Sequence, residues 1–169
     1  MNKTKRKALL DTNVWLNYYA GRADGESSKI AIKKLVAANW EIYACATSTK
    51  DVYYLLRVYL KSQYNKNGVQ GFKQSQINAI DEVAWKSIEH MMAIAKLVSV
   101  EPSDCKRALQ LRETHSDYED NLIIASAESI NADLLITSDK TLLKHAPIKT
   151  TTPAQICKEL EEEQLISTP

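Results

Sequence analysis

The sequence predicts an α/β protein in which helices cover both faces of a parallel β-sheet. The first observation is an alternation of short apolar runs with longer segments of helical periodicity along the whole chain. This order is typical of parallel sheets, because each strand is followed by a helix that returns the chain to the starting edge. The second observation is that residues 8–10 and 134–136 are apolar without interruption, as in strands buried on both faces. The order of the strands within the sheet does not follow from this pattern.

Length and composition predict one globular domain over residues 1–169. The chain is 44% hydrophobic and 25% charged, with a net charge of +1, so its surface as a whole is not that of a strongly basic nucleic-acid binder. Charge gathers at the two ends instead. Residues 1–6 form a basic arm and residues 159–163 an acidic stretch, and we interpret both as solvated termini.

The three cysteines are far apart and lack zinc-ligand spacing, so we expect reduced thiols. No signal peptide precedes Ala8, and no apolar run approaches the roughly 18 residues of a membrane span. These features predict a cytoplasmic protein without a membrane segment.

Five elements are expected before residue 61. They are a strand over residues 8–10, a short helix over 14–20 ended by Gly21, a helix over 27–38 with Ile30, Leu35 and Val36 among its apolar positions, a strand over 41–44, and a helix beginning near residue 50. From Val52, the last of these has apolar residues at i, i+3, i+4, i+7 and i+8, which is the pattern of an amphipathic helix. Ser48 or Thr49 is expected to cap it, which places Asp51 in its first turn.

A polar loop is expected next, over residues 61–71, because this segment contains two glycines. After it we expect a long helix over 76–95, a strand over 97–100, a helix over 103–112, a helix opened by 116–120, a strand over 134–137, a short strand at Ile148 and a helix over 152–163. Residues 122–127 are apolar on all sides, which indicates burial on more than one side. Thr152 is the expected N-cap of the last helix, with Pro153 at its first position.

Several acidic side chains are expected at one edge of this sheet, beyond the carboxyl ends of the strands, where ligands bind in open α/β folds. They are Asp11 after the first strand, Asp51 at the start of the helix after the second, Asp117 and Asp120 at the opening of the helix before residues 134–137, and Asp139 after that strand. Taken singly, each has a structural explanation as a turn former, a helix cap or a first-turn charge.

Taken together, the acids indicate a cation site. Two carboxylates about 4 Å apart repel by roughly 4 kcal/mol at an effective dielectric constant near 20. A cluster of them therefore either holds protons or binds a cation. Oxygen ligands without thiolate or imidazole favour Mg²⁺ or Mn²⁺ over zinc. Helix N-termini at the same edge favour phosphate, so the sequence predicts phosphoryl transfer or hydrolysis.

Four parts of the sequence resemble motifs of the PIN-domain family, and the last of them, Ile148 with Thr152 and Pro153, resembles its closing strand and helix start. Residues 9–14 resemble the family's opening strand and turn, residues 117–122 resemble the central acidic motif of a prokaryotic subgroup, and residues 135–139 resemble its strand-end motif. The resemblance covers nearly the whole chain in the right order. It implies a three-layer α/β/α sandwich around a parallel sheet of four to five strands. It also implies a metal-dependent endoribonuclease that uses Mg²⁺ or Mn²⁺ and leaves 5′-phosphate and 3′-hydroxyl ends.

The resemblance also assigns residues to the site. By position, the family's metal-binding acids match Asp11, Asp120 and Asp139, an extra acid of the subgroup matches Asp117, a supporting hydroxyl matches Thr137 and a polar neighbour matches Asn13. Asp51 stands where the family usually has glutamate, so its carboxylate reaches about one methylene less far. Its place as a ligand, direct or through water, stays open.

Partners follow from the same resemblance. Many small prokaryotic PIN proteins are the toxins of toxin–antitoxin pairs, and are usually homodimers inhibited by a small partner protein. We therefore expect an RNA substrate, an antitoxin as a candidate partner, a homodimer and no membrane. The alternative is a PIN-like fold that has lost catalysis and serves as an RNA- or protein-binding module.

Alternative functions have weaker support in the sequence. A haloacid-dehalogenase-like phosphohydrolase needs a second aspartate where this chain has Asn13, and a nucleotide-binding module needs a glycine-rich phosphate loop that the sequence lacks. A metal-free ribonuclease would need general acid–base histidines. His115 lies closest to the acids, two residues before Asp117, and we interpret it as a surface or hydrogen-bonded structural histidine.

Overall fold

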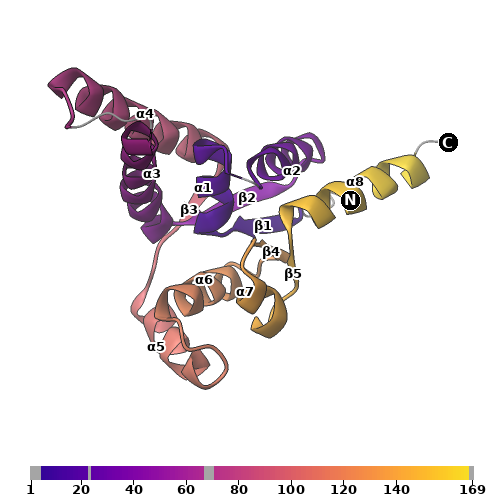
Figure 1. Cartoon of the computed structure of the whole chain (residues 1–169). Coiled ribbons are helices and arrows are strands. Elements are labelled where there is room, and N and C mark those ends of the chain that lie inside the picture. Colours follow the sequence, from indigo (N-terminus) through magenta and orange to yellow (C-terminus); the bar gives the residue numbers. More distant parts are fainter. Residues whose placement is uncertain (1–4, 23, 67–70, 168–169) are drawn as a thin grey trace.

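A five-stranded, all-parallel sheet forms the centre of the molecule (Figure 1). The computed structural model describes residues 5–22, 24–66 and 71–167. In spatial order, the strands are β3 (Lys96–Val98), β2 (Glu41–Cys45), β1 (Lys7–Leu10), β4 (Leu134–Ile136) and β5 (Thr150–Thr151). The chain builds outward from β1 to β3 on one side and then crosses to β4 and β5 on the other. The order therefore reverses between β1 and β4, which is the point where open α/β sheets bind ligands.

Helices lie on both faces of the sheet, as predicted. The helices are α1 (Thr12–Ala20), α2 (Gly25–Ala37), α3 (Ala46–Lys66), α4 (Gln74–Ile94), α5 (Pro102–Gln110), α6 (Tyr118–Ser129), α7 (Lys140–His145) and α8 (Pro153–Ser167), with a short 3₁₀ turn, η1 (Leu111–Glu113). Figure 1 shows α1 and α2 on one side of the sheet and α6 and α7 on the other. None of the helices in the described residues is long and apolar enough to cross a membrane.

The central strand contributes to two separate cores. Ala8 and Leu10 pack in one hydrophobic cluster with side chains of α1, α2, α3, α4 and α8, whereas Leu9 packs in a second with side chains of α6 and α7. Successive strand side chains point to opposite faces of a sheet, so this division follows from the uninterrupted apolar run at residues 8–10. The three-layer α/β/α architecture is therefore confirmed.

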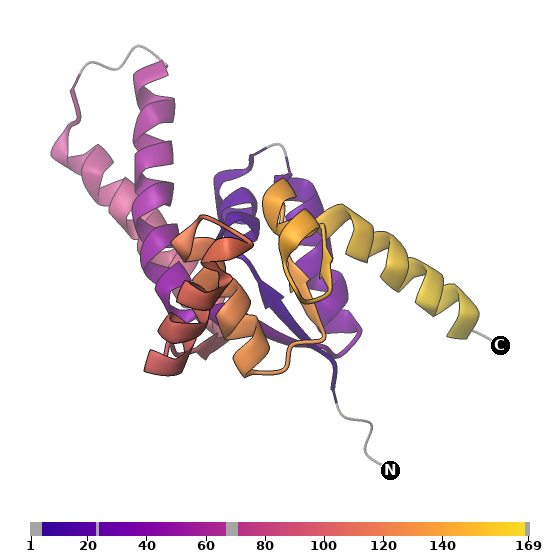
Figure 2. The same cartoon turned by 90° about the horizontal axis from the view of Figure 1, so that it is seen from below.

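Helices α3 and α4 project together from the sheet (Figure 2). The prediction of a loop over residues 61–71 is wrong for 61–66, which continue α3, and residues 67–70 lie outside the described part. Arg57 Nε of α3 donates to Asp81 Oδ1 of α4 at 2.6 Å, and the ring of Tyr64 meets that of Phe72, which precedes α4, with centroids 6.2 Å apart. The end of α3 is therefore in contact with the segment that leads into α4.

The last strand differs from the expected position, and α2 buries only some of its apolar residues. The last strand forms at residues 150–151, while Ile148 is a partly buried contact of the second core. On α2, Ile30 and Val36 are exposed, because the buried face is formed by Ala31, Ile32 and Leu35.

The two charged ends lie against the body and partly against each other. Arg6 donates from both terminal nitrogens to the Glu163 carboxylate, at 2.8 and 2.7 Å, and its guanidinium lies 4.3 Å from the ring centroid of Trp40. Lys34 also pairs with Glu161 at 2.8 Å. Arg6, Glu161 and Glu163 are solvent-exposed, as predicted for the two ends, and they form ion pairs in addition; residues 1–4 of the predicted arm lie outside the described part.

Candidate active site

Asp11 lies directly after β1, at the carboxyl edge of the sheet, and is only 4% exposed. It occupies the position before α1, but its side chain makes no capping hydrogen bond to that helix. Instead, Thr137 Oγ1 donates to Asp11 Oδ2 at 2.7 Å, and Asn13 Nδ2 donates to the same oxygen. The two residues predicted as supports, Asn13 and Thr137, therefore both contact Asp11.

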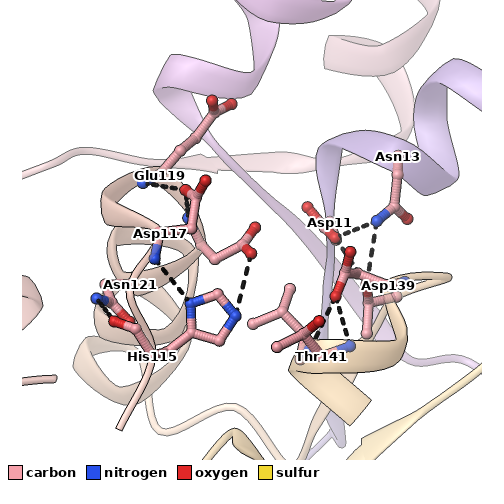
Figure 3. Close-up of polar contacts among 11 residues, drawn as sticks. Asp11, Asn13, His115, Asp117, Glu119, Asn121, Asp139 and Thr141 are labelled. Atoms are coloured by element: carbon pink, nitrogen blue, oxygen red, sulfur yellow. Dashed lines mark hydrogen bonds and ion pairs between the residues drawn. The ribbon is translucent and has the colours of Figure 1, made fainter. Parts of the chain in front are cut away.

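The turn after β4 is tied to the same network. Fully buried Thr137 accepts from the backbone N–H of Asp139 at 2.9 Å, and Asn13 Oδ1 accepts from the backbone N–H of Ser138 at 3.0 Å. Asp139 Oδ1 in turn accepts from the backbone of Thr141 and Leu142, at 2.7 and 3.0 Å, and caps α7 (Figure 3). One oxygen of Asp139 is therefore used as a cap, and the residue sits beside Asp11.

The opening of α6 supplies the acids on the other side of the site. Asp117 caps this helix through Oδ1, which accepts from the backbone of Glu119 at 2.8 Å and of Asp120 at 3.2 Å. Asp120 lies in the first turn of α6 and is half-buried. Its Oδ2 lies 3.4 Å from Nε2 of buried His115. In Figure 3, Asp117 and Glu119 stand on one side of the site, with Asp11, Asn13 and Asp139 on the other.

The pKa values show that the acids from the two sides interact. The pKa of Asp11 is raised to about 7, first by burial and then by the charges of Asp120 and Asp139, while the hydrogen bond from Thr137 opposes the rise. The pKa of Asp120 is raised to about 6, by burial and by the charges of Asp117 and Asp139, while His115 opposes it. The fold thus places like charges from three segments within range of one another.

Asp51 has other neighbours. Helix α3 begins at Ala46 directly after β2, so Asp51 lies in the second turn, not the first as predicted, and neither Ser48 nor Thr49 is the residue before the helix. Its Oδ1 lies 3.1 Å from Lys50 Nζ. The pKa of Glu119 is raised by burial first and then by the charge of Asp51.

Sequence reasoning missed Glu119 as the neighbour of Asp51. The only signal available was its position between Asp117 and Asp120 in the acidic motif. The sequence does not show which side of α6 faces α3, so this pairing could be seen only in the structure.

The donor set suits a hard divalent cation. The three central acids offer carboxylate oxygens without any thiolate, and mutual repulsion among them would be relieved by positive charge. Within the described residues, no group of three or more His, Cys, Asp or Glu side chains is already arranged closely enough to hold an ion. The residues therefore fit a metal by their chemistry, and binding would draw the carboxylates closer together.

Residues 7–141 match a family model described as a PIN domain. The chain belongs to the PIN-domain family. PIN domains are generally nucleases, and PIN nucleases generally use divalent metal ions. The match includes the central acids but ends before α8. No curated protein matches the sequence.

Solved structures share the PIN fold with this chain at low sequence identity. A structure of VapBC2 from Rickettsia felis, bound to a DNA fragment from its promoter, is 14% identical, with a TM-score of 0.61 and coverage of 86% of this chain and 98% of that one. A toxin–antitoxin complex from Klebsiella pneumoniae is 18% identical, with a TM-score of 0.56 and coverage of 86% and 97%. A protein from Pyrobaculum aerophilum is 13% identical, with a TM-score of 0.59 and coverage of 93% and 90%. At these identities the likeness shows the fold.

Proposed function

We propose that this PIN domain is a divalent-metal-dependent endoribonuclease that hydrolyses RNA phosphodiester bonds. The observation that carries the proposal is the convergence of Asp11, Asp120 and Asp139 at the switch point between β1 and β4. Burial of a carboxylate among like charges is unfavourable without a cation, and such arrangements are concentrated at functional sites.

Asp11, Asp120 and Asp139 are the residues that would hold Mg²⁺ or Mn²⁺. The bound ion would supply positive charge that stabilises the charge developing on the scissile phosphate. Thr137 and Asn13 orient Asp11 through the oxygen they share, Oδ2. Asp117 fixes the start of α6 and thereby the backbone that carries Asp120.

Asp51 has an outer role in this proposal. It is paired with Lys50 at 3.1 Å and lies beside Glu119, so it adds negative charge at the margin of the site. Its shorter side chain, where the family usually has glutamate, is compatible with contact through water.

We further propose that the protein acts as the toxin of a toxin–antitoxin pair, with a small antitoxin as its partner and a homodimer as its working form. Support comes from the Klebsiella pneumoniae structure, which is described as a toxin–antitoxin complex and shares the fold. The alternative is a PIN-like binding module without catalysis. One observation favours it: in the described segments, no three His, Cys, Asp or Glu side chains lie close enough together to hold a metal ion.

Cleavage of a mixed RNA pool distinguishes the two functions. The purified protein is incubated with Mn²⁺, Mg²⁺ or a chelator, beside the Asp11→Asn and Asp120→Asn variants. Asp133→Asn is the matched control, because Asp133 precedes β4 and caps the opposite edge of the sheet, where it accepts from Lys7 N at 2.7 Å. Metal-dependent cutting that leaves 5′-phosphate ends, is lost in both site variants and is retained in the control supports the nuclease. Products with 2′,3′-cyclic phosphate ends, or folded protein that neither cuts RNA nor binds manganese, would contradict it.

A further inference from the structure

His115 is a buried histidine at the entrance to α6 that has no part in the function proposed above. It is 6% exposed and is held by its backbone on both sides. Its N–H donates to the carbonyl of Leu111 at 2.9 Å, and its own carbonyl accepts from Asn121 Nδ2 at 2.8 Å. The ring therefore has a fixed anchor immediately before the acidic motif.

The two ring nitrogens of His115 have different hydrogen-bonding roles. Nδ1 accepts a hydrogen bond from the backbone N–H of Asp117 at 3.2 Å. An imidazole nitrogen that accepts carries no proton, so in the neutral ring the proton is on Nε2. Nε2 faces Asp120, whose Oδ2 lies 3.4 Å away.

No group among the described residues makes a well-aligned hydrogen bond with this buried Nε2. A buried donor is rarely left without an acceptor in a folded protein. The carboxylate of Asp120 is the acceptor at hand, and a small rotation of either side chain would complete the bond. The unpartnered nitrogen thus points to Asp120 as its partner.

The other two central acids show what such a contact does. Asp11 has one oxygen, Oδ2, held by Thr137 and Asn13, and Asp139 has one oxygen, Oδ1, held by the backbone of α7. In each case hydrogen bonds to one oxygen hold the carboxylate in a fixed orientation. Carboxylates that bind metals are commonly oriented in this way by a second group of the protein.

We propose that His115 is a positioning residue for Asp120, in which Nε2–H holds Oδ2 and leaves Oδ1 to the divalent cation. The inference rests on the proposed function, because it assigns a task to His115 only if Asp120 binds a metal. It differs from a purely structural role, in which the ring would matter only through Nδ1 and the backbone of Asp117.

Two substitutions separate these roles. His115→Asn keeps an oxygen near the position of Nδ1, which can still accept from the backbone of Asp117, but has no group that reaches Asp120. His115→Gln is long enough to present an amide N–H near the position of Nε2. His145→Gln is the matched control, because His145 is an exposed histidine at the end of α7.

The decisive measurement is manganese affinity, read at one fixed pH from the electron paramagnetic resonance signal of free Mn²⁺, together with the melting temperature of each variant. We expect His115→Asn to bind Mn²⁺ about 10- to 100-fold more weakly than wild type, as for other groups that orient metal ligands. We expect His115→Gln and His145→Gln to stay close to wild type. Folded His115→Asn with wild-type affinity would overturn the proposal.

The same titration separates failure of this inference from failure of the proposed function. If the wild-type protein binds no Mn²⁺, or if Asp120→Asn binds it as well as wild type does, the proposed metal site is contradicted. The proposed role of His115 is then contradicted as well. If wild type binds and Asp120→Asn does not, only the His115 variants decide. Should His115→Asn fail to fold, His115→Gln alone carries the test: retained affinity supports the proposal, and a tenfold or greater loss in folded protein overturns it.

Discussion

The hydroxyl of Thr137 donates a hydrogen bond of 2.7 Å to Asp11 Oδ2, across 126 positions of sequence. It joins the ends of β1 and β4, which are neighbours in the sheet, and both residues are buried. The hydroxyl therefore holds the most buried acid of the site in one orientation.

Replacing Thr137 by valine should lower stability and raise the pKa of Asp11 further. The change keeps the shape of the side chain but removes the donor, and a hydrogen bond to a charged group contributes about 1.5–3 kcal/mol. Thr137→Ser keeps a hydroxyl and should lie between Thr137→Val and wild type. Urea denaturation at pH 8 measures the change in the free energy of unfolding. Equal stability of Thr137→Val and wild type would show that this hydrogen bond is not formed in solution.

The metal-free protein should lose stability as the pH rises from about 4 to about 7. Folding raises the pKa of Asp11 to about 7 from an ordinary value of 3.8, so within this window the unfolded chain is ionised while the folded one keeps its proton. The free energy of unfolding then falls with pH, by about 1.4 kcal/mol per unit of pKa shift, and levels off above pH 7. Denaturation in the presence of a chelator at several pH values measures this slope.

Asp11→Asn should flatten that pH dependence and be more stable than wild type at pH 8 without metal. An amide can still accept from Thr137 but carries no charge among the neighbouring acids. A gain in stability on removal of a functional residue is expected where a site is built under strain. A variant that is less stable than wild type at pH 8, or that keeps the full slope, would mean that Asp11 is not the group responsible.

Asp51→Asn should reduce RNA cleavage less than Asp120→Asn does. Asp51 lies beside Lys50 and Glu119 at the margin of the site, so we expect a loss of about 10- to 100-fold, as for groups that act through a ligand. Asp120→Asn should abolish activity to the level of the assay background. Single-turnover cleavage rates at saturating Mn²⁺ compare the two. An equal loss in both would make Asp51 a direct ligand.

Glu163→Gln should have a small effect on stability, and Arg6→Ala a larger one. The ion pair between them is exposed, at 45% for the Arg6 side chain and 51% for Glu163, and pairs of this kind contribute about 0–1 kcal/mol. Arg6 also lies over the ring of Trp40, a contact that neutralising Glu163 leaves in place. Denaturation at low and high salt tests this, because only the ion pair should be weakened by salt.

Much of the fold could be predicted because local patterns determine it. The uninterrupted apolar runs at residues 8–10 and 134–136 identify buried strands, and a parallel sheet then brings the residues after them, Asp11 and Asp139, to one edge. Strand order could not be predicted in this way, because it depends on which strands pair across the whole chain. The extension of α3 through residues 61–66 was also missed, because the polar composition of this stretch is that of a loop.

Side-chain partners were the least predictable part of the site. The sequence placed His115 two residues before Asp117 but not the direction of its ring, which depends on the turn from η1 into α6. The same holds for Glu119, whose neighbour Asp51 comes from a distant helix. Contacts of this kind are set by packing between elements, and no periodicity in the sequence reports them.

The strand order β3-β2-β1-β4-β5 also has a consequence for how the protein is made. The central strand β1 is synthesised well before its neighbour β4, because strands β2 and β3 and helices α1 to α6 lie between them in the chain. Contacts between distant segments form late in folding, because a long loop must first be closed. The acids of α6 and of the turn after β4 cannot join Asp11 until that has happened. A nascent chain therefore carries no assembled acidic centre until the turn after β4 has been synthesised.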